Sequence, residues 1–310
     1  MWNDVEMHVL DSHLHLWDPR RLRYDWLEGP LDARFAETEL LHASIDLADT
    51  DAAVFIQADC AESQFIDEVR WVSDIADAVG VAAIVAGARL DRAGATSAHL
   101  DALAAHDLVV GVRHLLQGER DGLARSSDFL AGARQLAARG WTFDACVLSR
   151  QLNDVAALAA AVPDLRIALD HLGKPAVGTA ATPSAPTPEW LRDLAELAQH
   201  PLVFCKLSGL PAEAGGDWSA AQVEPFLDAA AVAFGAERLM WGSDWPVSVI
   251  GPAEPGDPHA PADGSPAYQP TARSRWADVV AAWATDRGHD VEAIMWQNAE
   301  TFYRRMPPSN

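Results

Sequence analysis

Short apolar runs recur along the chain and alternate with longer stretches whose apolar residues have helical spacing. A strand that is buried on both faces of a parallel sheet has such a continuous apolar run. We therefore expect strands at Val9–His15, Ala52–Gln57, Val81–Ala88, Val109–Leu115, Thr142–Val147, Arg166–His171, Leu202–Ser208 and Leu239–Asp244. Strands that alternate with helices in this way predict an α/β protein with a parallel (β/α)8 barrel, the TIM-barrel architecture.

The stretches between these runs carry apolar residues on one helical face. In residues 62–78, Phe65, Val69, Val72 and Ile75 have the spacing of an amphipathic helix. Similar patterns predict helices at Asn153–Ala161 and Glu189–Gln199, and a closing helix at Val291–Tyr303. No linker rich in proline, glycine and serine divides the chain, so we expect residues 1–310 to form a single barrel domain.

Two segments have the composition of loops. Residues 178–188 follow the sixth expected strand, and residues 251–270, rich in proline and glycine, follow the eighth. Loops that follow barrel strands lie at the end of the barrel where active sites are built. We interpret residues 251–270 as a lid, because Tyr268 and His259 offer groups that could contact a ligand.

The composition narrows the class of protein. The formal net charge is −22 and hydrophobic residues make up 49% of the chain. Because an acidic surface repels nucleic acid and anionic lipid, we expect a small-molecule substrate and no nucleic-acid or membrane partner; a homo-oligomer is compatible with the sequence. No apolar run has the length of a membrane span, the first residues do not resemble a signal peptide, and the three cysteines lack C-x-x-C spacing. We therefore expect a cytoplasmic location.

The first candidate chemistry lies in the first expected strand. Side chains alternate along a strand, so Asp11, His13 and His15 are predicted to share one face. Two imidazoles two residues apart can reach one atom, and neutral imidazole is a common ligand of zinc-like metals. The structural alternative is a half-buried strand in which the two histidines have no special role.

Other expected strands also end in polar side chains. His171 ends the sixth, Lys206 lies in the seventh and Asp244 ends the eighth. Arg113 and His114 end the fourth strand on opposite faces. Each alone has an ordinary structural explanation, such as a core imidazole, a helix cap or a surface ion pair. Because strand ends converge at one opening of a barrel, the residues together predict an active site.

The same stretches carry a resemblance to a known family. Between residues 11 and 246 the chain contains, in order, D-S-H-L-H-L-W-D-P, G-V-R-H, D-H-L-G-K-P, K-L-S-G-L and W-G-S-D-W-P. These motifs resemble the amidohydrolase superfamily, and within it the amidohydrolase 2 branch, which contains sugar-acid lactonases. The resemblance implies a (β/α)8 barrel that hydrolyses a lactone or a related ester or amide.

The resemblance also implies roles for single residues. His13, His15, His171 and Asp244 match metal or substrate positions of the family, and Asp244 matches its general base, with His171 as a second catalytic residue. The fifth expected strand lacks the histidine that metal-dependent members keep, which argues against a binuclear centre. Two options stay open: one divalent ion, zinc or manganese, held by this set, or a metal-free site.

The remaining candidates concern substrate binding. They are Gln57, Arg113, His114, Lys206, Trp17 and Trp245. The first four could bind hydroxyl or carboxylate groups, and the two tryptophans could stack on the face of a sugar ring.

These residues lead to one expected function and two alternatives. We expect hydrolysis of a small sugar-acid lactone, an aldonolactone, by water that Asp244 activates. One alternative is a metal-dependent decarboxylase of the same superfamily, which would release carbon dioxide without consuming water. The other is a barrel that binds a carbohydrate without turnover. Phosphate-binding loops, dinucleotide-binding turns and G-x-S-x-G elbows are absent from the sequence.

Overall fold

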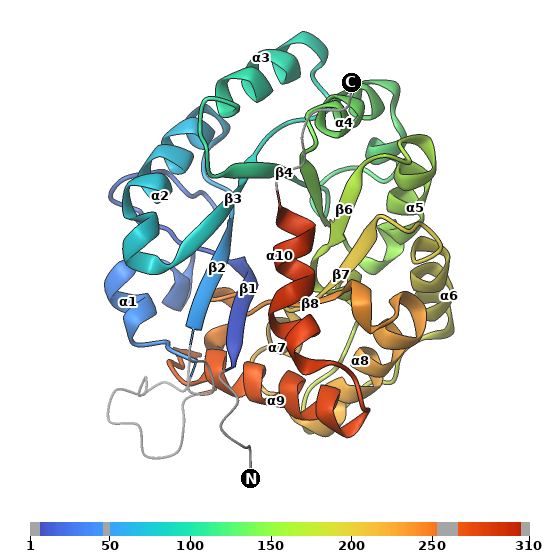
Figure 1. Ribbon diagram of the computed structural model, residues 1–310. Coiled ribbons are helices and arrows are strands. Elements are labelled where there is room, and N and C mark those ends of the chain that lie inside the picture. The colour runs from blue at the N-terminus through green and yellow to red at the C-terminus, as the bar shows by residue number, and fades with distance from the viewer. Residues whose placement is uncertain (1–6, 46–49, 253–265, 305–310) are drawn as a thin grey trace.

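The computed structural model describes residues 7–45, 50–252 and 266–304. In this part of the chain, parallel strands β1 to β8 form one sheet in sequential order (Figure 1). Their bounds are His8–Leu14, Thr50–Ile56, Val81–Gly87, Val109–Leu115, Thr142–Cys146, Arg166–Leu169, Val203–Leu207 and Leu239–Trp241. Backbone hydrogen bonds of 2.8 Å from Asp244 to His13 and from His15 to Trp245 close the ring. The predicted (β/α)8 barrel is confirmed.

Helices surround the strands and one helix crosses the end of the barrel. They are α1 (Glu37–Leu41), α2 (Phe65–Val79), α3 (Ala93–Leu103), α4 (Ser127–Ala138), α5 (Leu152–Ala161), α6 (Pro188–Leu197), α7 (Leu210–Glu213), α8 (Ala220–Phe234), α9 (Ala272–Asp286) and α10 (Asn298–Tyr303). Figure 1 shows α10 in front of the ring of strands. A π-helical turn, Ala293–Gln297, leads into it.

The interior of the barrel explains why α10 lies there. Small and medium apolar side chains fill the interior: Leu10, Val54, Ile56, Ala83, Val85, Val110, Ala168 and Met240. At the end where the strands begin, Phe302 of α10 packs on Phe204 of β7, with ring centroids 4.9 Å apart. Trp296 meets His8, the first residue of β1. This amino-terminal end is therefore covered by the closing helix, and the opposite end is left for a site.

Two strands end earlier than their apolar runs predict. β6 ends at Leu169 rather than His171, and β8 ends at Trp241 rather than Asp244. His171 and Asp244 both have a φ of 54°, in the left-handed region that non-glycine residues rarely adopt. The two candidate catalytic residues therefore belong to tight turns and not to strands.

An irregularity in β1 changes the predicted faces of its polar residues. The pairing of β1 with β2 shifts register between Asp11 and Leu14. His13 lies inside the barrel beside Lys206, whereas the Asp11 carboxylate meets Arg273 of α9 at 3.1 Å. The prediction that Asp11 shares a face with the two histidines is wrong, because a bulge shifts the alternation by one residue.

The segment interpreted as a lid is described only at its two ends. Ile250–Gly251 (β9) and Ala267–Tyr268 (β10) pair as a short antiparallel ladder. The Trp245 indole donates a hydrogen bond of 3.1 Å to the Tyr268 hydroxyl. Residues 253–265, which include His259, lie outside the described residues, so the lid stays a prediction.

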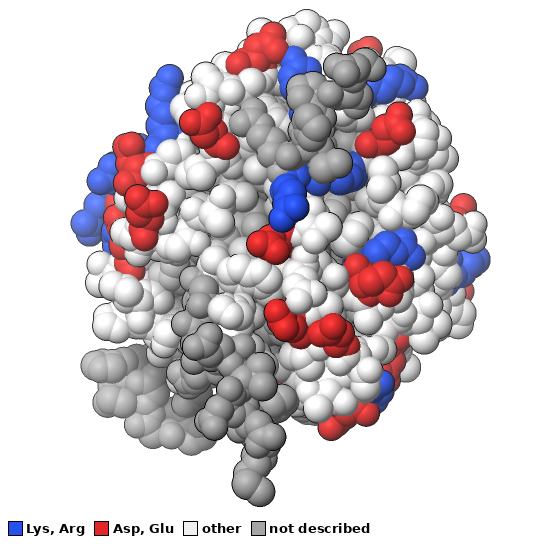
Figure 2. Space-filling model, in the orientation of Figure 1, with Lys and Arg blue, Asp and Glu red and all other residues white. Residues whose placement is uncertain are grey.

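Charged side chains of both signs are interspersed over the face of the molecule in Figure 2. The excess of acid is thus not gathered there into one large acidic area. Among the helices of the described ranges, none combines the length and apolarity needed to cross a bilayer. The expectations about partners remain predictions.

The ion pair between Asp11 of β1 and Arg273 of α9 can be tested for its contribution to the stability of the barrel. The Asp11 carboxylate also accepts backbone hydrogen bonds from Ser243 and His13, and both charged side chains are buried. Arg273→Met leaves a buried carboxylate without its cation and should cost about 3–5 kcal/mol of folding free energy. Thermal unfolding should show a melting temperature lower by roughly 10 °C.

The matched control is the double variant Asp11→Asn with Arg273→Met. Because no charge is then left unpaired, it should be less destabilised than the sum of the two single variants. Additive losses would show that the ion pair does not couple α9 to the barrel.

Candidate active site

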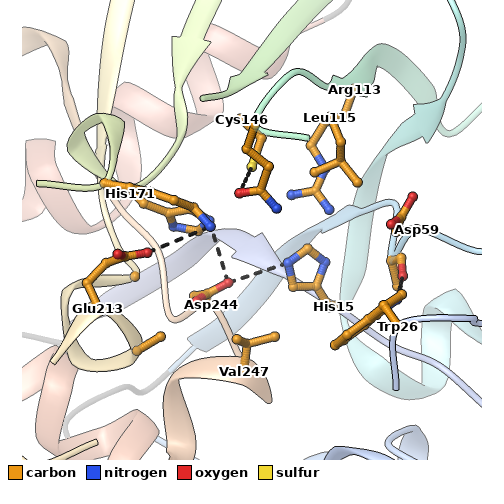
Figure 3. Close-up of a pocket in the computed structure, with 15 residues that line it drawn as sticks. His15, Trp26, Asp59, Arg113, Leu115, Cys146, His171, Glu213, Asp244 and Val247 are labelled. Atoms are coloured by element: carbon orange, nitrogen blue, oxygen red, sulfur yellow. Dashed lines mark hydrogen bonds and ion pairs between the residues drawn. The ribbon is translucent and has the colours of Figure 1, made fainter. Parts of the chain in front are cut away.

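A cavity of about 290 Å³ lies at the carboxyl ends of the barrel strands (Figure 3). Much of its wall is charged or imidazole side chains: His15, Asp59, Arg113, His171, Lys174, Glu213 and Asp244. Trp26, Leu115 and Val247 supply apolar surface. Polar groups that converge on a concave site of this kind are typical of an enzyme active site.

Three candidate metal ligands meet at the inner end of this cavity. The Nε2 atoms of His13 and His15 are 3.1 Å apart, and they lie 3.7 and 3.5 Å from Asp244 Oδ1. His171 Nε2 is 3.7 Å from the same oxygen. Ligand atoms placed about 2.1 Å from a tetrahedral zinc ion lie about 3.4 Å from one another. The spacing and chemistry of these donors therefore fit one zinc-like ion.

The imidazole of His15 is oriented by a backbone carbonyl. Its Nδ1 lies 2.8 Å from the carbonyl oxygen of Ile56, the last residue of β2. We assign the proton to Nδ1, since a carbonyl can only accept, and Nε2 then presents its lone pair to the cluster. A metal-binding histidine commonly has such a second partner.

The imidazole of His171 is held by the strand that follows it. Nδ1 of His171 lies 2.9 Å from the Ser208 hydroxyl at the end of β7. The next residue is Gly209, where a Cβ atom would come within 2.4 Å of the same Nδ1. Glycine is needed at this position because any side chain would push the imidazole out of the cluster.

The carboxylate of Asp244 has a different partner for each oxygen. Oδ1 faces the imidazoles, and Oδ2 accepts a 2.7 Å hydrogen bond from the Ser248 hydroxyl. Burial alone would raise the pKa of Asp244, but the imidazoles of His171 and His15 outweigh burial and hold that pKa well below its usual range. Asp244 is therefore ionised at neutral pH.

The three imidazoles are neutral at the same pH. Burial lowers the pKa of His15, and it lowers the pKa of His171 to about 4. Burial and the nearby Lys206 ammonium lower the pKa of His13 well below its usual value. Neutral imidazole is the form that binds metals, so the cluster is in its ligand state.

A buried layer of charge lies directly beneath the cluster. The Lys206 ammonium is 2.5 Å from Asp144 Oδ2, 3.0 Å from Asp170 Oδ1 and 3.0 Å from His13 Nδ1. Tyr303 of α10 donates a 2.7 Å hydrogen bond to Asp144. Burial raises the pKa of Asp144 to about 6, although Lys206 opposes this shift. For Asp170, Lys206 and His13 outweigh burial and hold the pKa well below its usual range.

This layer corrects the prediction for Lys206. The lysine is fully buried, points into the barrel as its strand pattern predicts, and has its charge balanced by carboxylates. It lies under His13 and is not part of the cavity wall, so it has no access to substrate. Asp144 and Asp170 are not among the candidate site residues that the sequence predicts. The signal was available, since a lysine that points into a barrel needs a carboxylate on a neighbouring strand.

Arg113 and His114, near the end of β4, point in opposite directions because neighbouring residues of a strand face opposite sides of the sheet. Arg113 points inward, where its guanidinium lies 3.4 Å from His13 Nε2 and 3.6 Å from Asp170 and donates to the Gln57 carbonyl. It lines the cavity, as expected for a substrate-binding candidate. His114 points outward, packs on Phe129 of α4, and lines an adjoining cavity together with Gln57.

The two tryptophans predicted to stack on a sugar ring do not line the cavity. Trp17 is fully buried and donates to the carbonyls of Leu31 and Ala33, and Trp245 is fully buried against Tyr268. Neither reaches the cavity, because their large apolar rings fill the core beneath the loops. Trp26 lies on the cavity wall instead, fixed by a 2.8 Å hydrogen bond from its indole to the Ala58 carbonyl.

Further wall residues come from the turns after β5, β6 and β7. Lys174, whose φ is 53°, lies 3.7 Å from Glu213 Oε1 across the cavity. Cys146 ends β5, the strand without the family's histidine, and burial raises its pKa to about 11. Among the described residues, the groups of side chains close enough to share one ion consist of histidines and carboxylates and do not include Cys146, so Cys146 is not added to the donor set.

The barrel and its cluster of histidines with one aspartate define a known class of enzyme. A family model described as an amidohydrolase matches residues 10–305. The chain belongs to this amidohydrolase family.

The chain is also similar in sequence and structure to individual proteins of known name. The chain is 35% identical over 253 residues to an L-fucono-1,5-lactonase of Burkholderia multivorans, covering 78% of this chain and 83% of that protein. It is also similar to a solved amidohydrolase of Burkholderia multivorans with bound zinc, with 32% identity and a TM-score of 0.75 over 96% of this chain and 100% of that one. A 2,6-dihydroxybenzoate decarboxylase structure has a TM-score of 0.57 at 14% identity, over 96% and 98% of the two chains, and shows a shared fold alone.

Lys206→Met tests the structural role assigned to this lysine. The variant leaves Asp144 and Asp170 buried without their cation, and we expect it to lose about 3–5 kcal/mol of stability. Thermal unfolding measures this loss. A variant with unchanged melting temperature and a raised KM would instead return Lys206 to substrate binding.

Proposed function

We propose that the protein hydrolyses a small sugar-acid lactone with one divalent metal ion bound at the histidine cluster. One observation carries the proposal: three neutral imidazoles and an ionised carboxylate converge within 3.1–3.7 Å at the inner end of a polar cavity. The lactonase and zinc-bound relatives support both parts of the proposal.

His13, His15 and Asp244 would hold the ion, with His171 beside them. When bound, a divalent cation polarises a carbonyl and lowers the pKa of a water ligand to about 7. The cation in turn requires donors that are already deprotonated at neutral pH. The low pKa values of His13, His15 and Asp244 satisfy this requirement.

The protein's own side chains would handle the proton and the developing charge. Asp244 Oδ1 would take a proton from water as the water oxygen bonds to the lactone carbonyl carbon. Arg113 would stabilise the negative charge that forms on the carbonyl oxygen. The same proton would then pass from Asp244 to the ring oxygen as the C–O bond breaks. One water is consumed and a hydroxy acid is released.

The rest of the cavity suits a ring that carries hydroxyl groups. Trp26 offers an aromatic surface for a sugar face, and the Lys174–Glu213 pair offers a donor and an acceptor 3.7 Å apart. Asp59 offers a further exposed acceptor. An aldonolactone has a ring face for Trp26 and hydroxyl groups for Lys174, Glu213 and Asp59.

The decarboxylase alternative rests on likeness of fold, as to the 2,6-dihydroxybenzoate decarboxylase at 14% identity, so we favour the hydrolase. The third alternative, binding without turnover, conflicts with a base and a donor cluster that are both assembled. A pH-indicator assay on aldonolactones separates the hydrolase from the other two alternatives, because hydrolysis releases one acid per lactone.

Asp244→Asn tests the general base. The amide keeps the size of the side chain but cannot accept the proton, so kcat on an aldonolactone should fall at least about 100-fold. Circular dichroism should show an intact fold. Turnover at the wild-type rate would remove Asp244 as the base.

Metal removal tests the cofactor independently. Dialysis against a chelator should abolish hydrolysis, and one equivalent of zinc or manganese per chain should restore it. Elemental analysis of the purified protein should find about one metal ion per chain. Full activity of a metal-free preparation would contradict the metal while leaving the role of Asp244 standing.

A further inference from the structure

A second cavity of about 250 Å³ adjoins the candidate active site. It lies among the segments that follow β2, β3 and β4, and includes Gln57, Phe65, Arg89, His114 and Glu119 in its wall. The two cavities share four wall residues: Asp59, Arg113, Leu115 and Gln117. A molecule bound beside Asp244 could therefore extend past Arg113 into the second cavity.

The second cavity contains a buried donor without an acceptor. His114 Nδ1 accepts a 3.3 Å hydrogen bond from the Leu90 backbone, which places the proton of the neutral imidazole on Nε2. That Nε2 is buried and has no hydrogen-bond partner among the described residues; the Glu119 carboxylate lies 3.6 Å away. Arg113 Nε is unpaired in the same way. Buried polar atoms are nearly always hydrogen-bonded, so a ligand is the natural partner.

The charges of this cavity select against an anionic ligand. Asp59, Glu62 and Glu119 are acidic, and the Arg89 guanidinium is already paired with Asp91 at 3.1 Å and with Glu119 at 2.5 Å. Carboxylates, amides and an imidazole beside one aromatic ring are the groups that hydrogen-bond hydroxyls. The chemistry therefore fits a neutral, hydroxyl-rich group.

We propose that the second cavity is a subsite for a hydroxyl-rich extension of the lactone, either a glycosyl residue or a longer polyol tail. This inference rests on the proposed lactonase function and narrows its substrate class. The volumes agree with it: each cavity alone falls just below the about 300 Å³ at which typical ligand sites begin, and the two together lie inside that range.

Gly118→Trp is the test variant. Gly118 lines only the second cavity, its φ is not in the left-handed region, and a Cβ atom there meets no atom within 4 Å. The new side chain can therefore fill the cavity without straining the backbone. Gly118→Leu gives a smaller filling. Gly94→Trp is the matched control, because Gly94 also has open space at Cβ and lies in α3, outside the described cavities.

The measurement is kcat and KM on three substrates: a hexono-1,5-lactone, its 6-O-glycosyl derivative and an octonolactone. In the wild type and in Gly94→Trp, an extended lactone should have a KM about tenfold lower than the hexonolactone, which corresponds to about 1.4 kcal/mol. Gly118→Leu should reduce this advantage and Gly118→Trp should remove it, with kcat and KM on the hexonolactone within about twofold of wild type. The glycosyl and octonolactone arms show which extension is preferred.

Three results would overturn the subsite. The wild type could hydrolyse the hexonolactone and gain nothing from either extension, or the advantage could survive in Gly118→Trp. Gly118→Trp could also slow all three lactones equally. In each case the lactonase proposal stands. Failure to hydrolyse any lactone, with metal supplied, overturns the proposed function and the subsite with it.

Discussion

The seam between β8 and β1 is the constraint on which the site depends. The Asp244 backbone donates to the His13 carbonyl and the His15 backbone donates to the Trp245 carbonyl, each at 2.8 Å. Three candidate metal ligands are thus fixed to one another by backbone hydrogen bonds adjacent to their own side chains. At Gly242 a Cβ atom would lie 2.8 Å from that of His13, so only glycine lets the strands approach this closely. The spacing of these three donors is set by the backbone hydrogen bonds that close the barrel just beyond the ends of β1 and β8, and a site held by a rigid backbone keeps its geometry.

Charge balance beneath the seam is the second constraint. An isolated ion costs several kcal/mol to bury, so the Lys206 ammonium is tolerated only because carboxylates surround it. Lysine has three donors, and Lys206 meets three partners, in Asp144, Asp170 and His13. A planar guanidinium would not match this arrangement, which gives a physical reason for a lysine in a chain whose other cations are nearly all arginine. Tyr303 joins the closing helix to the same layer.

The fold could be predicted because it depends on patterns that repeat along the chain. Eight apolar runs located the strands, and the period of two placed Lys206 inside the barrel correctly. The pattern failed wherever the backbone departs from a regular strand. The bulge in β1 turned Asp11 outward, and the left-handed backbone at His171, in the turn after β6, brought that residue to the site although it does not share a face with the inward Ala168 and Asp170. The register of β6 with β7 could have indicated Asp170. Ala168 pairs with Phe204, and two residues after each of them Asp170 lies beside Lys206. Trp245 could not be assigned from sequence, because a large aromatic residue near a strand end suits the core and the cavity equally well.

The departures from regular backbone gather at the cavity, and this distribution has a physical meaning. Among the described residues, six that are not glycine have positive φ, and four of them line the cavity: Asp59, His171, Lys174 and Asp244. Each such conformation costs on the order of 1–3 kcal/mol and persists only where neighbouring contacts enforce it. His171 is enforced by Ser208 and Asp244 by Ser248. The barrel therefore supplies stability through its apolar interior and its paired charges, and that stability offsets the strain needed to aim side chains at one point. The turns, rather than the strands, then decide which groups face the ligand, so other residues of these turns can change substrate choice while the histidine cluster and the fold stay the same.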